Sequence, residues 1–104
     1  MEIKRVIEEF KREIKKLYGD RLKSVILYGS YARGNATTDS DIDLLIVPGG
    51  NVYPGEEIDR MIEIITDINL KYGVLLSVYP VSEKDYSCVN SPLLINVRRE
   101  GIHT

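Results

Sequence analysis

Two aspartates at the start of an apolar run place the strongest constraint on the fold of this chain. Asp41 and Asp43 flank Ile42, and the residues that follow up to Val47 are all apolar, which is typical of a buried strand. Residues two apart in a strand project from the same face, so both carboxylates point at one spot, with Cα atoms roughly 6.5–7 Å apart. Two anions in a buried strand are costly unless a cation neutralises them. The run therefore predicts a divalent-metal site.

The oxygen ligands of this pair suit Mg²⁺ or Mn²⁺. These ions bind a few carboxylates together with substrate phosphates, and a pair of ions about 3.5–4 Å apart supports in-line phosphoryl chemistry. A simpler alternative places Asp39, Ser40 and Asp41 in a solvated turn before an edge strand, with only Asp43 partly buried. The sequence just before the pair favours the functional interpretation.

A Gly-Ser turn precedes the aspartates. Residues 24–28 are predicted to form a short buried strand, and Gly29 and Ser30 follow it directly. A glycine lets a ligand approach the backbone, and a serine at a helix start leaves amides unpaired, so the turn is a candidate anion site. Arg33 shares the face of Ser30 in a short helix and could reach a phosphate or the carboxylates, although an isolated arginine is more often a surface charge.

Two common nucleotide-binding loops are excluded at this turn. Gly29 and Gly34 have the spacing of a Walker-type loop, but Asn35 and Ala36 stand where Lys and Ser or Thr are required. No dinucleotide-type G-x-G-x-x-G occurs either.

Hydrophobic periodicity predicts the order α-β-β-α-β-α. One α/β domain, residues 1–104, is the simplest interpretation, because no repeat or linker interrupts this order. The predicted segments are a helix with its core face from Ile3 to Leu17 before Gly19, strands 24–28 and 42–47, a flexible connection from Pro48 to Gly55, a helix that carries Ile58, Met61, Ile62, Ile65, Ile68 and Tyr72 before Gly73, a strand 74–81, and a helix from Ser91 and Pro92 to near Gly101.

Composition and charge argue against several classes of protein. The net charge of −2 and the pI near 5.4 disfavour a polynucleotide partner, because such binding rests on Lys and Arg that neutralise phosphates. Cys88 and His103, each the single residue of its type, cannot form a Cys/His zinc site. No apolar run approaches the roughly 18 residues of a membrane span, and the charged N-terminal segment is unlike a signal peptide. We therefore expect no membrane association and a cytoplasmic location.

The stretch from Gly29 to Leu44 resembles a known signature. It contains Gly29-Ser30-Tyr31-Ala32-Arg33-Gly34 and then Ser40-Asp41-Ile42-Asp43-Leu44. This is similar to the G-S-x-x-R-G…S-D-x-D-L signature of the DNA polymerase β-like nucleotidyltransferase superfamily, and more narrowly it looks like the minimal nucleotidyltransferase group.

The resemblance implies a fold and a site. The fold is a small α+β nucleotidyltransferase domain with a mixed sheet flanked by helices. The resemblance assigns nucleotide binding to Gly29, Ser30, Arg33 and Ser40, and it makes Asp41 and Asp43 the catalytic residues that hold Mg²⁺ or Mn²⁺. The implied reaction moves a nucleoside monophosphate, expected to be AMP from ATP, onto a hydroxyl, and pyrophosphate leaves.

The same resemblance implies a partner. Members of the minimal group are often antitoxins of an all-helical HEPN-type toxin, and some transfer AMP to a tyrosine of that toxin. A protein partner would then complete a chain of 104 residues that is too short for an acceptor domain of its own. A homo-oligomer is also compatible with the sequence.

One position departs from the family pattern. Active relatives usually carry a third carboxylate on the third strand, and this chain has Ser77 there. That carboxylate helps to bind the metal and can take the proton of the attacking hydroxyl. Two functions therefore stay open: an enzyme that transfers AMP to a partner protein, and a binding module of the same fold that masks its partner. Drug or tRNA modification is a weaker third.

The other polar residues are expected to be structural. His103 is predicted to be a frayed terminal residue. Four acidic residues near element ends are expected to be solvated charges or helix caps: Glu56, Glu57, Glu83 and Asp85. Four tyrosines are expected to be half-buried packing residues more often than base-stacking ones: Tyr31, Tyr53, Tyr79 and Tyr86.

Overall fold

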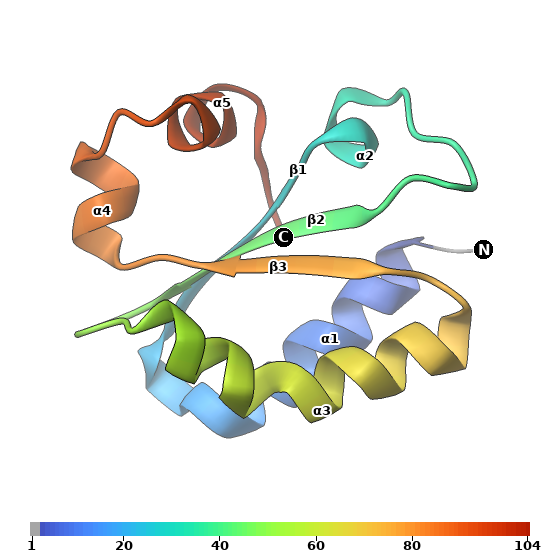
Figure 1. The fold of residues 1–104 in the computed structure, drawn as a ribbon. Helices are drawn as coiled ribbons and strands as arrows, with labels where there is room; N and C mark the ends of the chain where they lie inside the picture. Colours follow the sequence, from blue (N-terminus) through green and yellow to red (C-terminus); the bar gives the residue numbers. More distant parts are fainter. Residues whose placement is uncertain (1–2) are drawn as a thin grey trace.

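The computed structural model describes residues 3–104, and within them a four-stranded sheet carries helices on both faces (Figure 1). The elements are α1 (Ile3–Tyr18), the 3-10 turn η1 (Gly19–Arg21), β1 (Leu22–Tyr28), α2 (Ser30–Arg33), β2 (Ile42–Pro48), α3 (Pro54–Tyr72), β3 (Leu76–Pro80), α4 (Glu83–Cys88), α5 (Pro92–Glu100) and β4 (Ile102–His103).

The sheet is mixed, as the resemblance implies. Its strands lie in the order β3-β2-β1-β4, with β1 antiparallel to both β2 and β4. β2 and β3 are parallel, and α3 is the crossover between them, as a parallel connection requires. The expected order α-β-β-α-β-α is therefore confirmed for the main elements, and the structure adds the short α2, α4 and β4.

Alternation along β2 separates two cores. Ile42, Leu44 and Ile46 face α1 and α3, which cover one side of the sheet (Figure 1). Leu45 and Val47 face the opposite side and pack in the second core with residues of α5. Asp43 has the same parity as Leu45 and Val47, so its side chain belongs to this second face. Asp43 thus lies on the face of the sheet that is not covered by α1 and α3.

Local signals set the helix boundaries much as the sequence predicts. Gly73 ends α3 in the left-handed conformation, with φ 63°, and donates its backbone N–H to Asn69 O. Ser91 is the N-cap of α5 and accepts a hydrogen bond from Leu94 N at 3.2 Å, with Pro92 in the first turn. Ser82 caps α4 in the same way, which is a helix that the sequence analysis did not predict.

The outer edge of β3 is blocked against further pairing. The β2–β3 register turns the backbone of Leu76, Val78 and Pro80 away from β2. The N–H of Leu76 donates to Asn69 Oδ1 at 2.9 Å, and Pro80 has no N–H. Only Val78 offers a donor along this edge, which is how proteins commonly protect an exposed strand.

Several details differ from the sequence prediction at helix surfaces. Leu17 is 48% exposed, and Tyr18, four residues after Ile14, takes the core position instead. Ile62 is 48% exposed and lies outside the core face of α3. Pro54 belongs to the first turn of α3 and not to the connection before it, because proline fits the first helical turn without loss of a hydrogen bond.

Glu57 contradicts the expectation of a solvated charge, although it does contact the N-cap residue of α3. Its side chain is only 1% exposed. Tyr18 donates its hydroxyl to Glu57 Oε1 at 2.7 Å, and Tyr53 N donates to Oε2 at 3.4 Å. Burial and the carboxylate of Glu57 raise the pKa of Tyr18, so the phenol keeps its proton and remains a donor. Glu57 therefore fastens α1 to the start of α3.

His103 is also not frayed. It forms β4 with Ile102 and pairs with Ile26 of β1, while Thr104 N donates to Val25 O at 3.0 Å. Gly101 makes this return possible, because a Cβ there would come within 2.6 Å of Ile26 Cγ2. Within the described residues, no helix is long and apolar enough to cross a membrane.

Candidate active site

The candidate site begins at a glycine turn between β1 and α2. Gly29 has φ 74° and ψ −152°, a backbone conformation that residues with a Cβ rarely adopt. Arg33 N donates to Gly29 O at 3.0 Å, and Asn35 N donates to Ser30 O at 3.1 Å. These bonds tighten the turn, so the chain leaves β1 and forms a single helical turn before the loop to β2.

Gly29 lies directly against Asp43. A Cβ added at Gly29 would overlap Asp43 Oδ2 and come within 3.1 Å of Asp43 Cγ. The absent side chain is therefore what lets the carboxylate reach the backbone of the turn. The structure thus joins the two motifs that the sequence analysis singled out, although they belong to different elements.

Burial and neighbouring charges both act on the Asp43 carboxylate. Its pKa is raised above the ordinary aspartate value, first by burial and then by the charge of Asp41, while Arg33 lowers it in part. Asp41 itself is exposed at the entrance of β2. The burial of the pair therefore matches the alternative from the sequence, in which Asp41 lies in a solvated turn and only Asp43 is partly buried. The charge of Asp41 nevertheless acts on Asp43.

Ser40 forms part of the turn that precedes β2. Its hydroxyl oxygen accepts a hydrogen bond from Thr37 N at 2.9 Å and lies 3.4 Å from Thr37 Oγ1. Ser40 N in turn donates to Thr37 O at 3.1 Å. In this structure Ser40 closes the turn that leads Asp41 into β2.

Arg33 lies between two acidic groups. Its Nη1 is 3.8 Å from Glu100 Oε2, and both side chains are partly exposed. It also acts on the charge of Asp43. A loose, solvent-screened ion pair of this kind stabilises little, so the guanidinium is free to turn to a more highly charged group such as a phosphate.

A row of side chains across the sheet forms the floor of the site. Tyr28 on β1 is the register partner of Asp43, and Ser77 on β3 is the partner on the other side. Burial, then Asp43, then Tyr79 raise the pKa of Tyr28, which keeps its phenol neutral. Ser77 therefore stands beside Asp43, where a third carboxylate would complete the row.

Comparison with known proteins identifies the family of this chain. The model of a family described as "Nucleotidyltransferase domain" matches residues 7–98. The chain belongs to this nucleotidyltransferase family. It is 40% identical over 102 residues to "Putative protein adenylyltransferase MJ0604" of Methanocaldococcus jannaschii, which covers 97% of this chain and 96% of that protein. A second protein of that organism, "Putative protein adenylyltransferase MJ0141", is 42% identical over 77 residues, or 74% of this chain and 77% of that protein.

Two solved structures share the fold of this nucleotidyltransferase. One is described as a "putative nucleotidyltransferase from Sulfolobus solfataricus", with a TM-score of 0.61, 22% identity, and coverage of 95% of this chain and 76% of that chain. The other is described as a "toxin-antitoxin with AMP-PNP", with a TM-score of 0.64, 16% identity, and coverage of 92% and 70%. At these identities the likeness establishes the fold.

The residues present fit a metal that is bound together with a nucleotide. Asp41 and Asp43 supply two carboxylates whose mutual repulsion a divalent cation would relieve. Within residues 3–104, no group of three or more His, Cys, Asp or Glu side chains comes together. Two carboxylates are what Mg²⁺ needs from a protein when substrate phosphates supply further oxygens. Asp41 and Asp43 would hold it.

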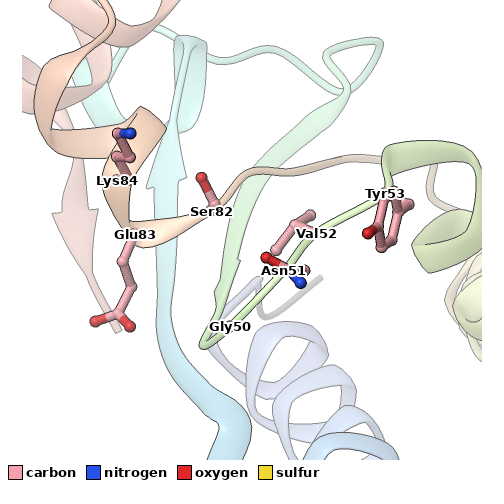
Figure 2. A pocket seen from close by; sticks show the side chains of 7 residues that line it. All are labelled: Gly50, Asn51, Val52, Tyr53, Ser82, Glu83 and Lys84. Carbon is pink, nitrogen blue, oxygen red and sulfur yellow. The ribbon is translucent and has the colours of Figure 1, made fainter.

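The pocket shown in Figure 2 is a separate feature. It has a volume of about 400 Å³, and the residues that line it are Gly50, Asn51, Val52, Tyr53, Ser82, Glu83 and Lys84. These segments follow the ends of β2 and β3. Asp43 lies near the start of β2, a strand length of roughly 20 Å away. The pocket is therefore not part of the candidate active site.

Tyr28 is the site residue that the sequence analysis missed. The four tyrosines that the analysis considered have other places, with Tyr31 and Tyr86 packed against the two cores and Tyr53 and Tyr79 exposed. The position of Tyr28, directly before Gly29 at the end of a strand, was the available signal. Its pairing with Asp43 depends on the strand register, which the sequence does not give.

Proposed function

We propose that this nucleotidyltransferase transfers AMP from ATP to a hydroxyl of a partner protein, with Mg²⁺, and that the partner is a HEPN-type toxin. The observation that carries the proposal is the contact of Gly29 with Asp43. The contact brings the glycine turn against one of the two carboxylates, and the charge of the other acts on that carboxylate. A triphosphate with its metal needs both of these features at once.

The comparisons support the choice of nucleotide and acceptor. Two relatives that this chain resembles over most of their length are named as protein adenylyltransferases. One structure with the same fold is described as a toxin-antitoxin with AMP-PNP, an ATP analogue. These names favour adenylate as the group transferred and a protein as its acceptor.

Each residue of the site then has a task in the reaction. The Gly29 turn and the Arg33 guanidinium bind phosphate oxygens, and Asp41 and Asp43 hold Mg²⁺, which when bound neutralises charge on the phosphates. Tyr28, kept neutral beside Asp43, can orient a phosphate or the acceptor by a hydrogen bond. The acceptor oxygen bonds to the α-phosphorus as the bond to the bridging oxygen breaks. Pyrophosphate leaves, and the hydroxyl proton passes to water.

The proposal is tested by mass. The chain is purified from its native host together with any bound protein and incubated with Mg²⁺ and each of the four NTPs. We expect intact-mass analysis to show adenylate added to the partner with ATP, and none with a matched Asp41→Asn, Asp43→Asn double variant. Failure to modify any copurified protein with all four NTPs would sink the proposal.

Ser77 gives a second candidate function a specific basis. Because it is the register partner of Asp43, the position suited to a general base holds a neutral hydroxyl that performs this task poorly. The chain would then be an antitoxin or binding module that neutralises its partner by covering it. The Asp41→Asn, Asp43→Asn double variant separates the two functions: masking predicts that it still neutralises the partner, and transfer predicts that it binds without neutralising.

A further inference from the structure

The sheet has two outer edges, β3 and β4. The β3 edge is blocked, whereas the β4 edge is open. The register of Leu27 with Ile102, and the hydrogen bond from Thr104 N to Val25 O, direct Ile102 and Thr104 toward β1. His103 between them therefore turns its backbone N–H and C=O outward. No strand within residues 3–104 pairs with this side of β4.

An apolar groove lies beside this open edge, between β4 and α1. It has a volume of about 320 Å³, and its apolar lining comes from Ile3, Ile7, Leu27 and Ile102. Ile102 is 47% exposed. Exposed apolar side chains next to unpaired strand groups form the kind of surface that proteins usually cover.

The α1 wall of the groove carries charges that complement a second copy of the same wall. Lys4, Glu8 and Lys11 all line the groove and alternate in sign along the helix. None of the three is joined in an ion pair within the described residues. When two such helices run antiparallel about a twofold axis that passes near residue 6 of α1, Lys4 of each lies opposite Glu8 of the other. The wall is therefore self-complementary, as an isologous contact requires.

We propose that this chain forms a symmetric dimer through β4 and the groove between β4 and α1. His103 pairs with His103 of the partner subunit, so that the two backbones exchange hydrogen bonds and the sheets join into one. A twofold axis perpendicular to the sheet keeps both α1 helices on the same face. The two Ile102 side chains, which share the face of Leu27, fill the space between these helices.

The two candidate active sites stay open in this dimer. Leu27 belongs to the core on the α1–α3 side of the sheet, and Asp43 lies on the opposite face. Stable interfaces bury roughly 1,200–2,000 Å² in total, and a strand of two residues supplies only a small part of that. The groove and the charged wall of α1 must therefore provide most of the contact, and we expect an equilibrium that depends on concentration.

The first experiment is sedimentation equilibrium of the purified chain over a wide concentration range. We expect the mass to rise from 11.8 kDa toward twice that value. Two matched variants locate the contact, because Ile102 and Ile62 are 47% and 48% exposed. Ile102→Lys should weaken dimerisation by about a hundredfold or more, since it buries a charge in the contact, whereas Ile62→Lys on α3 should leave it unchanged.

A charge exchange then tests the symmetry. Lys4→Glu with Lys11→Glu makes the wall wholly acidic, and Glu8→Lys makes it wholly basic, so each variant alone should remain monomeric. Mixed in equal amounts, the two should form a heterodimer at least as tight as the wild-type dimer. A wild-type chain that stays monomeric at its solubility limit would overturn the proposal and leave the groove to a different protein. So would a dimer that is insensitive to Ile102→Lys, or variants that do not recombine.

Discussion

One carboxylate lies near each end of β2, Asp43 partly buried and Glu57 almost completely buried, and the chain treats them differently. Near the start of the strand, burial and the charge of Asp41 raise the pKa of Asp43, and no donor within residues 3–104 hydrogen-bonds to it. Beyond the end of the strand, Glu57 is almost completely buried, and its two oxygens accept hydrogen bonds from Tyr18 and from Tyr53 N.

The difference separates a structural carboxylate from a candidate binding one. Glu57 is satisfied by its own chain, so its burial stabilises the junction of α1 and α3 and leaves nothing for a ligand to do. Asp43 is held in a state that the chain alone makes unfavourable, because a like charge lies near it and a glycine backbone covers one side. A group that costs stability in the isolated chain and is relieved by a bound cation is typical of a binding site.

Gly29→Ala should have the largest effect of the proposed substitutions, because it disrupts the contact between Gly29 and Asp43. The new methyl group would overlap the carboxylate and strain the positive φ, so we expect a loss of about 2–4 kcal/mol of unfolding free energy. Binding of AMP-PNP with Mg²⁺, measured by calorimetry, should fall by about a hundredfold or more. Gly34→Ala is the control, because it has a similar φ but open space around it and should lose stability without the same loss of affinity.

Removal of Glu57 should affect stability and spare the site. In Glu57→Leu the hydroxyl of Tyr18 loses its acceptor in a buried place, which should cost about 1–3 kcal/mol in urea unfolding. Adding Tyr18→Phe should recover most of this loss, because both partners are then apolar. Nucleotide affinity should stay within twofold of wild type in both variants. A large drop in affinity would mean that the two ends of β2 are coupled.

Ser77→Asp should separate AMP transfer from masking of the partner, because it adds a third acidic group beside Asp43. If the chain transfers AMP, the added carboxylate can serve as base, and we expect the transfer rate to rise by about tenfold or more. A Ser77→Asn variant of similar size is the control and should give no increase. A variant that transfers no faster than wild type would indicate that the missing base does not limit the reaction.

Asp43→Asn should give the smallest effect, with the opposite sign to Glu57→Leu. Without its charge the side chain no longer repels Asp41, so the unfolding free energy at neutral pH should rise by about 0.5–1 kcal/mol. Because the folded-state pKa of Asp43 is raised, the wild type gains relative stability as it takes up this proton at falling pH. The advantage of the variant should therefore shrink in acid, and urea unfolding from neutral pH to about pH 4 measures it.

The parts of this nucleotidyltransferase that the sequence predicts are those that local signals determine. The Gly29 turn, the Asp41–Asp43 pair and the caps at Gly73 and Ser91 are each set within a few residues. Their fold is confirmed, and the roles assigned to the site residues remain predictions. Glu57 looked like a first-turn acid because its partner Tyr18 is 39 residues away in the sequence.

The same limit explains the pairings that were missed. Strand β4 is two residues long and is defined by its pairing with Ile26 and Leu27, and the next residue, Thr104, contacts Val25, 79 residues earlier. Its sequence carries no alternation of apolar and polar residues that would indicate a strand. Tyr28 likewise became part of the site only through its register with Asp43. Long-range pairings of this kind follow from the whole topology and not from any short window.

The blocked edge of β3 also limits how the proposed protein substrate could reach the candidate site. Ser77 and Tyr79 on this strand face the candidate site, yet Asn69 and the missing amide of Pro80 leave no ladder for an incoming peptide to extend. A substrate cannot be held here as an added strand, as many peptide-binding domains hold theirs. The proposed acceptor hydroxyl would instead have to approach the face of the sheet on which Asp43 lies.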